Sequence, residues 1–307
     1  MTSDPIIFYI FLIFTGAAIL ATVALFARVS LLVVYIALGI LLGPSVFNLV
    51  TDPQLISNIA HIGIIFLLFL LGINLQPQKL IQMLRQTTLV TGLSSLLFLV
   101  IGFLVASLFG FTHKEAFVIG ATMMFSSTII GLKLLPTTVL HHQHIGELII
   151  SILLMQDLIA IIILMLLPAR WEMAVPVIEI MQLVLSLIGV LTFAYLFARF
   201  ILIKLIQRFD RIQEYIFLMA IGWCLGMAKL ASLVGLSAEI GAFIAGIVLA
   251  TSPISIFIGD SLKPLRDFFL VIFFFALGAS FDLGMISQVL LPALLLAAIL
   301  LLLKPYV

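Results

Sequence analysis

The feature that most constrains the fold is a succession of apolar segments, each long enough to cross a lipid bilayer. A transmembrane helix needs about 20 apolar residues. Eleven such segments follow one another with short connections, near residues 5–27, 30–50, 55–75, 87–110, 113–135, 147–168, 175–204, 213–234, 236–252, 263–281 and 286–306. The sequence therefore predicts an all-α polytopic membrane protein with a single transmembrane domain over residues 1–307 and no soluble domain between the spans.

The composition excludes several classes of protein. Charged residues make up 9% of the chain, whereas a soluble domain carries about 25%. The net charge of +1 gives no electrostatic basis for a nucleic-acid partner. Cys224 is the single cysteine, so no internal disulfide can form. The environment that we expect for this chain is the lipid bilayer.

The basic residues predict the orientation of the chain. If the N-terminus is outside, three basic residues that flank the spans lie outside, and these are Lys114, Arg170 and Lys229. Ten then lie inside: Arg28, Lys79, Arg85, Lys133, Arg199, Lys204, Arg208, Arg211, Lys263 and Arg266. Inner loops of membrane proteins carry an excess of Lys and Arg. This bias predicts an outside N-terminus and supports the span count.

An acid lies deep within one of the spans. Asp157 is near the centre of the apolar run 148–164, and the polar residue Gln156 precedes it. A carboxylate at the bilayer centre costs about 2.5–3.5 kcal/mol on insertion scales. Burial raises the pKa of a carboxylate unless a cation compensates its charge. We therefore expect Asp157 to bind either a proton or a monovalent cation.

The fifth span is interrupted by hydroxyl residues at Ser126, Ser127 and Thr128, with Gly131 shortly after them. Transporters use unwound segments of this kind to direct carbonyl groups at ions. In the alternative interpretation, the hydroxyls bond to the preceding turn and only bend the helix. The Gln156–Asp157 pair in the next span favours the unwound interpretation. The hydroxyl and carbonyl groups of these three residues, together with Gln156, are candidate neutral ligands for the cation.

Six motifs in order resemble the monovalent cation:proton antiporters, specifically the Kef-type branch of potassium-efflux and sodium–proton exchangers. They are Gly39–Pro44, Phe66–Leu75, Ser126–Thr128, Gln156–Asp157, Val234–Gly246 and Phe273–Gly278. The resemblance covers essentially all 307 residues. It implies a thirteen-span fold of inverted repeats, of which this chain would hold about eleven spans, with an unwound fifth helix. It also implies a dimerisation panel, a mobile core, and hence a homodimer in a bacterial inner membrane.

The resemblance also implies roles for individual residues. Asp157 matches the family's essential aspartate, and Gln156 replaces a second acid found in electrogenic sodium relatives. Lys304 matches a lysine that lies beside the ion site, and it would pair with Asp157 in the empty state. The implied function is exchange of K⁺ or Na⁺ for protons by alternating access around Asp157. We expect no cofactor and no bound metal other than the transported cation.

The sequence departs from the Kef pattern in several places. Kef-like proteins continue with two further spans and a cytosolic nucleotide-binding domain after the lysine helix, so we expect residues 1–307 to be a truncated domain. His61 and Asn74 stand where glutamate is common. The expected loop 255–263 holds one acid, Asp260, so glutathione gating is not implied.

Three other functions compete with exchange: an enzyme, a cation channel and a non-transporting subunit. The sequence has no Gly-x-Gly-Asp protease pattern, no aspartate-rich prenyl-transfer pair and no His-Glu-x-x-His helix, so we expect no enzyme activity. The histidines of the segment 141–144 lack helical metal-binding spacing and are expected in a solvated loop. A cation channel and a non-transporting subunit remain alternatives, because composition does not separate a channel from a carrier.

Overall fold

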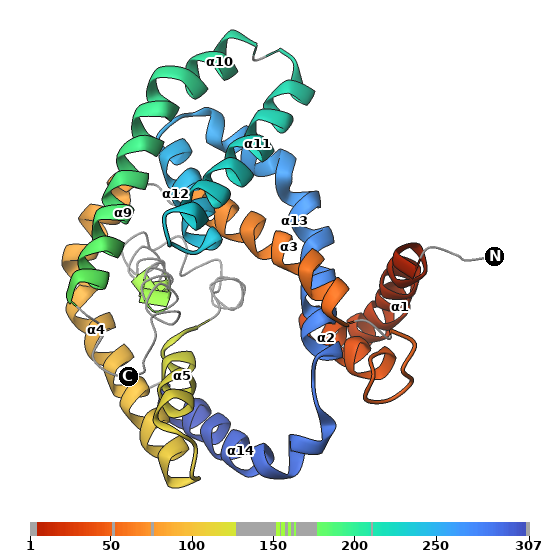
Figure 1. Cartoon of the computed structure of the whole chain (residues 1–307). Helices are drawn as coiled ribbons and strands as arrows, with labels where there is room; N and C mark the ends of the chain where they lie inside the picture. The colour runs from red at the N-terminus through yellow and green to blue at the C-terminus, as the bar shows by residue number, and fades with distance from the viewer. Residues whose placement is uncertain are drawn as a thin grey trace. The chain divides into compact units, whose positions relative to one another are not determined.

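The fold was obtained as a computed structural model, which describes residues 5–50, 53–74, 77–126, 152–153, 155–156, 159–160, 163, 177–209 and 211–304. Only the backbone is described at residues 5, 53–54, 74, 77–86 and 177–180. This part of the chain is helical and contains no strand (Figure 1). Its elements are α1 (Pro5–Ala27), α2 (Leu31–Leu42), α3 (Pro53–Asn74), α4 (Pro77–Leu108), α5 (His113–Met124), α9 (Val177–Phe197), a π-helix (Ala198–Leu202), α10 (Ile203–Arg208), α11 (Gln213–Leu233), α12 (Ala238–Ala250), α13 (Ile254–Ala279), a 3-10 turn (Leu283–Met285) and α14 (Ile286–Leu303).

The chain divides into two compact units, and it enters each of them twice. Unit 1 comprises Met1–Asn74 and Ser186–Met285, and it holds α1, α2, α3, α10, α11, α12 and α13. Unit 2 comprises Leu75–Leu185 and Ile286–Val307, and it holds α4, α5 and α14. Helix α9 begins in unit 2 and ends in unit 1.

Unit 1 is held together by two close helix crossings with glycine on both sides. Helix α2 crosses α13, where a Cβ on Gly39 would lie 2.1 Å from the Phe275 carbonyl oxygen and one on Gly278 would lie 2.0 Å from that of Ile36. Helix α3 crosses α12 in the same way. There, a Cβ on Gly246 would lie 2.1 Å from the Phe69 carbonyl oxygen. Backbones approach this closely only where small residues line both helices.

The two crossings in unit 1 match each other contact for contact. Each glycine faces the carbonyl group three residues before the opposing glycine, and Gly72 completes the second set against Phe243. Gly246 follows Gly39 by 207 residues, and Gly278 follows Gly72 by 206. The same spacing of 206 separates Gly63 from Phe269, which meet where α3 crosses α13. Unit 1 therefore contains two equivalent sets of packing contacts.

Unit 2 is built on an antiparallel pair of helices, α4 and α5. A Cβ on Gly102 would lie 2.6 Å from Gly120 Cα, and one on Gly120 would lie 2.5 Å from the Leu99 carbonyl oxygen. The turn between the helices uses Gly110 in the left-handed region, at φ 82°. Thr112 then starts α5 as its N-cap in a capping box with Glu115. Helix α14 packs against α4.

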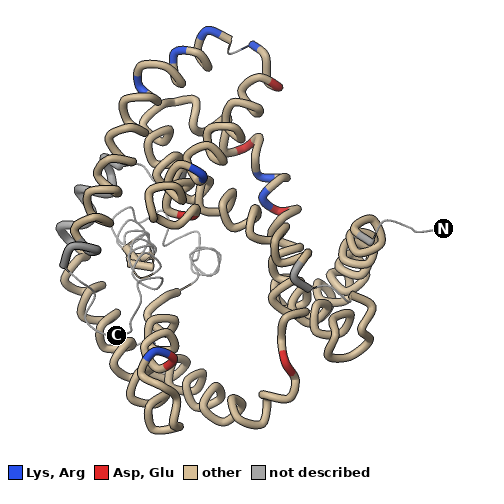
Figure 2. Tube along the Cα trace, viewed as in Figure 1, with Lys and Arg blue, Asp and Glu red and all other residues tan. Residues whose placement is uncertain are grey.

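The helices have the length and composition of membrane spans. Within the described residues, six helices are long and apolar enough to cross a bilayer, and two shorter apolar helices are α2 and α12. Figure 2 shows long uncharged stretches, and α1 and α14 carry no charged residue at all. The protein is therefore an all-helical polytopic membrane protein, as the apolar segments predict.

Several boundaries differ from the sequence predictions. Helix α2 ends at Leu42, although the predicted span continued to residue 50, because Gly43 and Pro44 stop the helix. Helix α4 begins at Pro77, ten residues before the predicted span. The predicted loop 255–263 is helical and forms the first part of α13.

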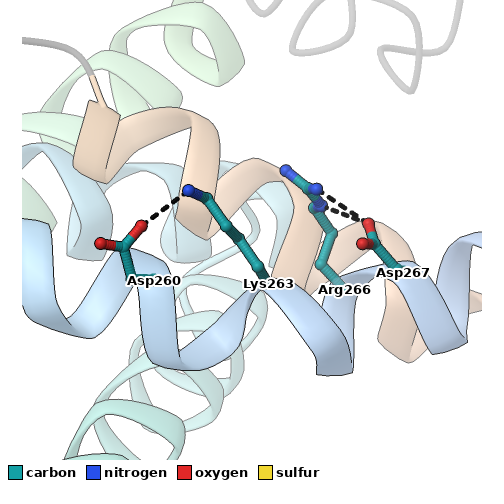
Figure 3. Close-up of polar contacts among 4 residues, drawn as sticks. All are labelled: Asp260, Lys263, Arg266 and Asp267. Carbon is teal, nitrogen blue, oxygen red and sulfur yellow. Dashed lines mark hydrogen bonds and ion pairs between the residues drawn. The ribbon is translucent and has the colours of Figure 1, made fainter.

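The first part of α13 is helical although its charged composition is typical of a loop. Figure 3 shows two ion pairs along it, Lys263 with Asp260 at 2.6 Å and Arg266 with Asp267 at 2.8 Å. Lys263 follows Asp260 by three residues, so the helix itself brings their side chains together. Three of these four side chains are more than half exposed, so the ion pairs lie at the surface of the protein.

Candidate functional site

The candidate site begins where α5 ends within unit 2. The last residue of the helix is Met124, and Phe125 is extended, with φ −90° and ψ 151°. The last carbonyl groups of a helix have no partner within it. In an apolar protein these carbonyl groups need a donor or a cation from elsewhere.

Lys304 supplies that donor. It follows the last residue of α14, and its Nζ donates to the carbonyl oxygen of Phe125 at 2.5 Å and to that of Met123 at 3.4 Å. The same Nζ lies 5.5 Å from the ring centroid of Phe98 on α4. A positive charge is favoured at a helix C-terminus by the helix dipole and over an aromatic face by the ring quadrupole. The half-buried ammonium group therefore contacts two carbonyl oxygens and one aromatic ring.

Gln156 approaches the same helix end. Its side chain is 6% exposed, and its Oε1 accepts a hydrogen bond of 3.1 Å from the Ser126 backbone N–H. The structure therefore brings together three of the residues that the sequence singled out, Ser126, Gln156 and Lys304. They come from segments far apart in the chain.

The structure does not describe all of the other residues that the sequence singled out. Asp157, Ser127 and Thr128 lie outside the described residues, as do Lys133 and the segment 141–144. Lys229, which the orientation argument places outside, is exposed. In the part of the chain that the structure describes, no three metal-binding side chains gather at one point.

His61 and Glu239 form a contact in unit 1 that the sequence did not suggest. His61 Nδ1 lies 3.5 Å from Glu239 Oε1, with the two side chains 60% and 20% exposed. Glu239 occupies the first turn of α12, where Ser237 provides the N-cap by accepting from the Ile240 N–H. Glu239 therefore lies in the first turn of α12 and pairs with His61.

The site offers a cation an oxygen-rich environment. Carbonyl and amide oxygens are neutral ligands of the kind that hard cations prefer. The ammonium group of Lys304 is itself a monovalent cation, and it occupies two of these carbonyl oxygens. Sequence reasoning missed the carbonyl groups of Met123 and Phe125 and the ring of Phe98. A backbone carbonyl leaves no trace in residue identity, and Phe98 is one of 26 phenylalanines.

An apolar helical protein that buries a lysine against a helix end has the features of an ion-transporting membrane protein. The family model described as the transmembrane sodium/hydrogen exchanger matches residues 10–307. The chain therefore belongs to the sodium/hydrogen exchanger family. This result confirms the family to which the six motifs point.

Individual relatives place the chain within the Kef-type branch. It is 31% identical to the glutathione-regulated potassium-efflux system protein KefC of Cronobacter sakazakii over 281 residues, which are 89% of this chain and 45% of that protein. It is 28% identical to KefC of Escherichia coli K12 over 285 residues, which are 90% of this chain and 46% of that protein. The chain thus spans about half the length of these relatives.

Proposed function

We propose that the protein exchanges a monovalent cation, K⁺ or Na⁺, for protons across a membrane. The observation that carries the proposal is the Lys304 ammonium group on the carbonyl oxygens of Met123 and Phe125, beside the buried amide of Gln156. The same oxygens are suited to hold a transported cation once Lys304 withdraws. Family membership and the potassium-efflux proteins among the relatives support this reaction.

In the proposed mechanism, Asp157 is the single acid for which the proton and the cation compete. It follows Gln156 directly in the chain. Ser126, Ser127, Thr128 and Gln156 supply neutral oxygen ligands. Lys304 neutralises the empty site and moves aside when the cation binds. One carboxylate gives one-for-one exchange.

We assign the two units different roles in alternating access. In our proposal residues 1–307 form one exchanger domain, unit 1 is a dimerisation panel, and unit 2 is the mobile core that carries the ion. The matched crossings in unit 1 support an internal repeat, and inverted repeats are the usual basis of alternating access. We propose the thirteen-span inverted-repeat fold, the unwound fifth helix and the homodimer on this basis.

The orientation is also part of the proposal. Lys and Arg gather on the π-helix and α10, as Figure 2 shows, and this segment carries Arg199, Lys204 and Arg208. Under the positive-inside rule it faces the cytoplasm. The N-terminus of the chain then lies outside, in a bacterial inner membrane.

The first test is the substitution Asp157→Asn in the protein as the cell makes it, reconstituted in proteoliposomes. We expect loss of K⁺- and Na⁺-driven proton flux with an unchanged fold, because the amide keeps the shape and removes the titrating charge. The matched control is Asp260→Asn, which alters an exposed carboxylate paired with Lys263. Retained flux in Asp157→Asn would refute the single-carboxylate mechanism. Flux that does not saturate and needs no counter-ion would instead indicate a channel.

A further inference from the structure

Two buried hydroxyl groups, those of Thr91 and Ser95, lie on the face of α4 that leads to Lys304. Thr91 and Ser95 are 0% and 2% exposed. Neither Thr91 Oγ1 nor Ser95 Oγ makes a hydrogen bond within the part of the chain that the structure describes. A buried hydroxyl group without a partner is unfavourable, because it has lost the hydrogen bonds that water gave it.

The usual solution in a membrane helix is visible elsewhere in this protein. Thr22 donates to the Ala18 carbonyl oxygen at 2.8 Å, and Thr192 donates to that of Ile188 at 2.8 Å. Thr122 likewise donates to Ile119 at 2.7 Å. Bonding to the preceding turn is thus available to any Ser or Thr on a helix. Thr91 and Ser95 do not use it, so their hydroxyl groups are free for another partner.

Their positions define a line along one face of α4. At 100° per residue, Thr87, Thr91, Ser95, Phe98 and Gly102 fall within an arc of about 80°. Phe98 contacts the Lys304 ammonium group and Gly102 contacts α5, so this face is the one directed at the candidate site. Thr87 begins the apolar span of α4. The line therefore runs from the end of the span to the site.

The spacing suits a file of water molecules. Residues four apart on a helix are separated by about 6 Å along its axis. Two hydrogen bonds of about 2.8 Å each, through one water molecule, cover that distance. Phe98 follows Ser95 by one further turn and marks the position of Lys304. A polar face buried at membrane depth is tolerated where it lines water.

We propose that Thr91 and Ser95 hold a file of water molecules along α4, and that protons pass along it between the membrane face where α4 begins and the Lys304–Gln156 site. This inference rests on the proposed exchange function. The proton enters as hydronium at one end. Each water molecule in turn forms an O–H bond to the incoming proton and breaks another O–H bond to pass a proton on, until the acid of the proposed exchange accepts it, so the hydroxyl groups of Thr91 and Ser95 keep their own protons. In the proposed orientation this route opens to the cytoplasm.

Hydroxyl-removing substitutions test the route. We expect Thr91→Val combined with Ser95→Ala to lower the proton-coupled exchange rate by about tenfold or more, because water that bridges polar groups is lost with those groups. Thr91→Ser, which keeps the hydroxyl group, should retain most of the rate. Ser107→Ala is the matched control. Its hydroxyl group is also unpaired, but it lies about 160° around the helix from Thr91.

Thiol accessibility provides a readout that does not depend on exchange. The one native cysteine, Cys224, is buried and can be replaced by alanine. Thr91→Cys and Ser95→Cys should then react with a small cationic thiosulfonate added at the face where α4 begins, in right-side-out and inside-out vesicles. Ser107→Cys should not react from that face.

Each outcome decides the inference. Reactive thiols together with a slowed double variant support it. A double variant that exchanges at the unaltered rate overturns the proton route, and thiols unreactive from both faces overturn the water file. If the unaltered protein does not exchange at all, the proposed function and the proton route both fail, and the thiol reactions alone still decide whether the file of water exists.

Discussion

Replacing Lys304 by methionine removes the ammonium group from the end of α5 and leaves the length of the side chain almost unchanged. Three interactions are lost: the hydrogen bonds to Phe125 and Met123, the attraction of the helix C-terminus, and the contact with the Phe98 ring. A hydrogen bond to a charged group is worth about 1.5–3 kcal/mol, and a charge at a helix end up to about 2 kcal/mol. A cation–π contact at a site that keeps some solvent adds about 0.5–1 kcal/mol.

These contributions overlap, because one ammonium group makes all three contacts and remains half-exposed. We expect the ion-free protein to lose about 2–4 kcal/mol of unfolding free energy in Lys304→Met, since the Met123 and Phe125 carbonyl oxygens lose the donor that the ammonium group supplies. The loss is measured as a lower melting temperature in detergent without K⁺ or Na⁺. The control is Lys229→Met, which removes an exposed lysine from α11 and should leave the melting temperature unchanged.

Added cation distinguishes the proposed role of Lys304 from a purely structural one. A ligand that binds the folded state stabilises it by mass action. K⁺ or Na⁺ should therefore raise the melting temperature of Lys304→Met more than that of the unaltered protein, because the cation no longer displaces the ammonium group. The pH profile of exchange should shift to higher pH, since the loss of a nearby positive charge raises the pKa of a carboxyl group. Equal stabilisation by cation and an unmoved pH profile would refute the reasoning.

Two further predictions concern unit 1. Gly246→Ala places a Cβ 2.1 Å from the Phe69 carbonyl oxygen and should destabilise the protein by about 1–3 kcal/mol or more in thermal unfolding, whereas Gly226→Ala, which meets open space, should be neutral or slightly stabilising. A stable Gly246→Ala would mean that α3 and α12 do not cross as described. A double-mutant cycle on His61 and Glu239 should give a coupling of at most about 1 kcal/mol, because the histidine is 60% exposed. A coupling several times larger would show that this pair is buried in the assembled protein.

Much of the fold can be predicted from the sequence, because a bilayer restricts a spanning chain to apolar helices. Apolar runs located α1, α3, α11 and α14 to within a few residues. The predicted loop 255–263 was wrong, because the charged first part of α13 resembles a loop by composition. In this part of α13 the charged side chains pair with one another at the protein surface, so they do not interrupt the helix. The predicted number of spans stays a prediction.

The sequence points to three side chains that the structure places near one another, and it does not point to the backbone groups that they contact. Ser126, Gln156 and Lys304 were noticeable because each is polar within an apolar run. Their partners are the carbonyl oxygens of Met123 and Phe125, which become available only because α5 ends where it does. Which residue of an apolar run ends a helix depends on tertiary contacts. The sequence therefore indicated the neighbourhood and could not identify the ligands.

The spacing of 206 residues between contacting positions in unit 1 also occurs at the candidate site in unit 2. Gly63 and Phe269, which meet where α3 crosses α13, are 206 residues apart, and so are Phe98 and Lys304, which meet beside the end of α5. In a chain made of two repeats, symmetry gives most contacts a second copy elsewhere. A contact between a residue and its own equivalent in the other repeat has no second copy, so it lies where the two repeats face each other. Under the proposed inverted repeat, Lys304 then stands at the level that both membrane faces reach equally. A cation displacing its ammonium group there can be released to either side by a small movement, which is what alternating access requires.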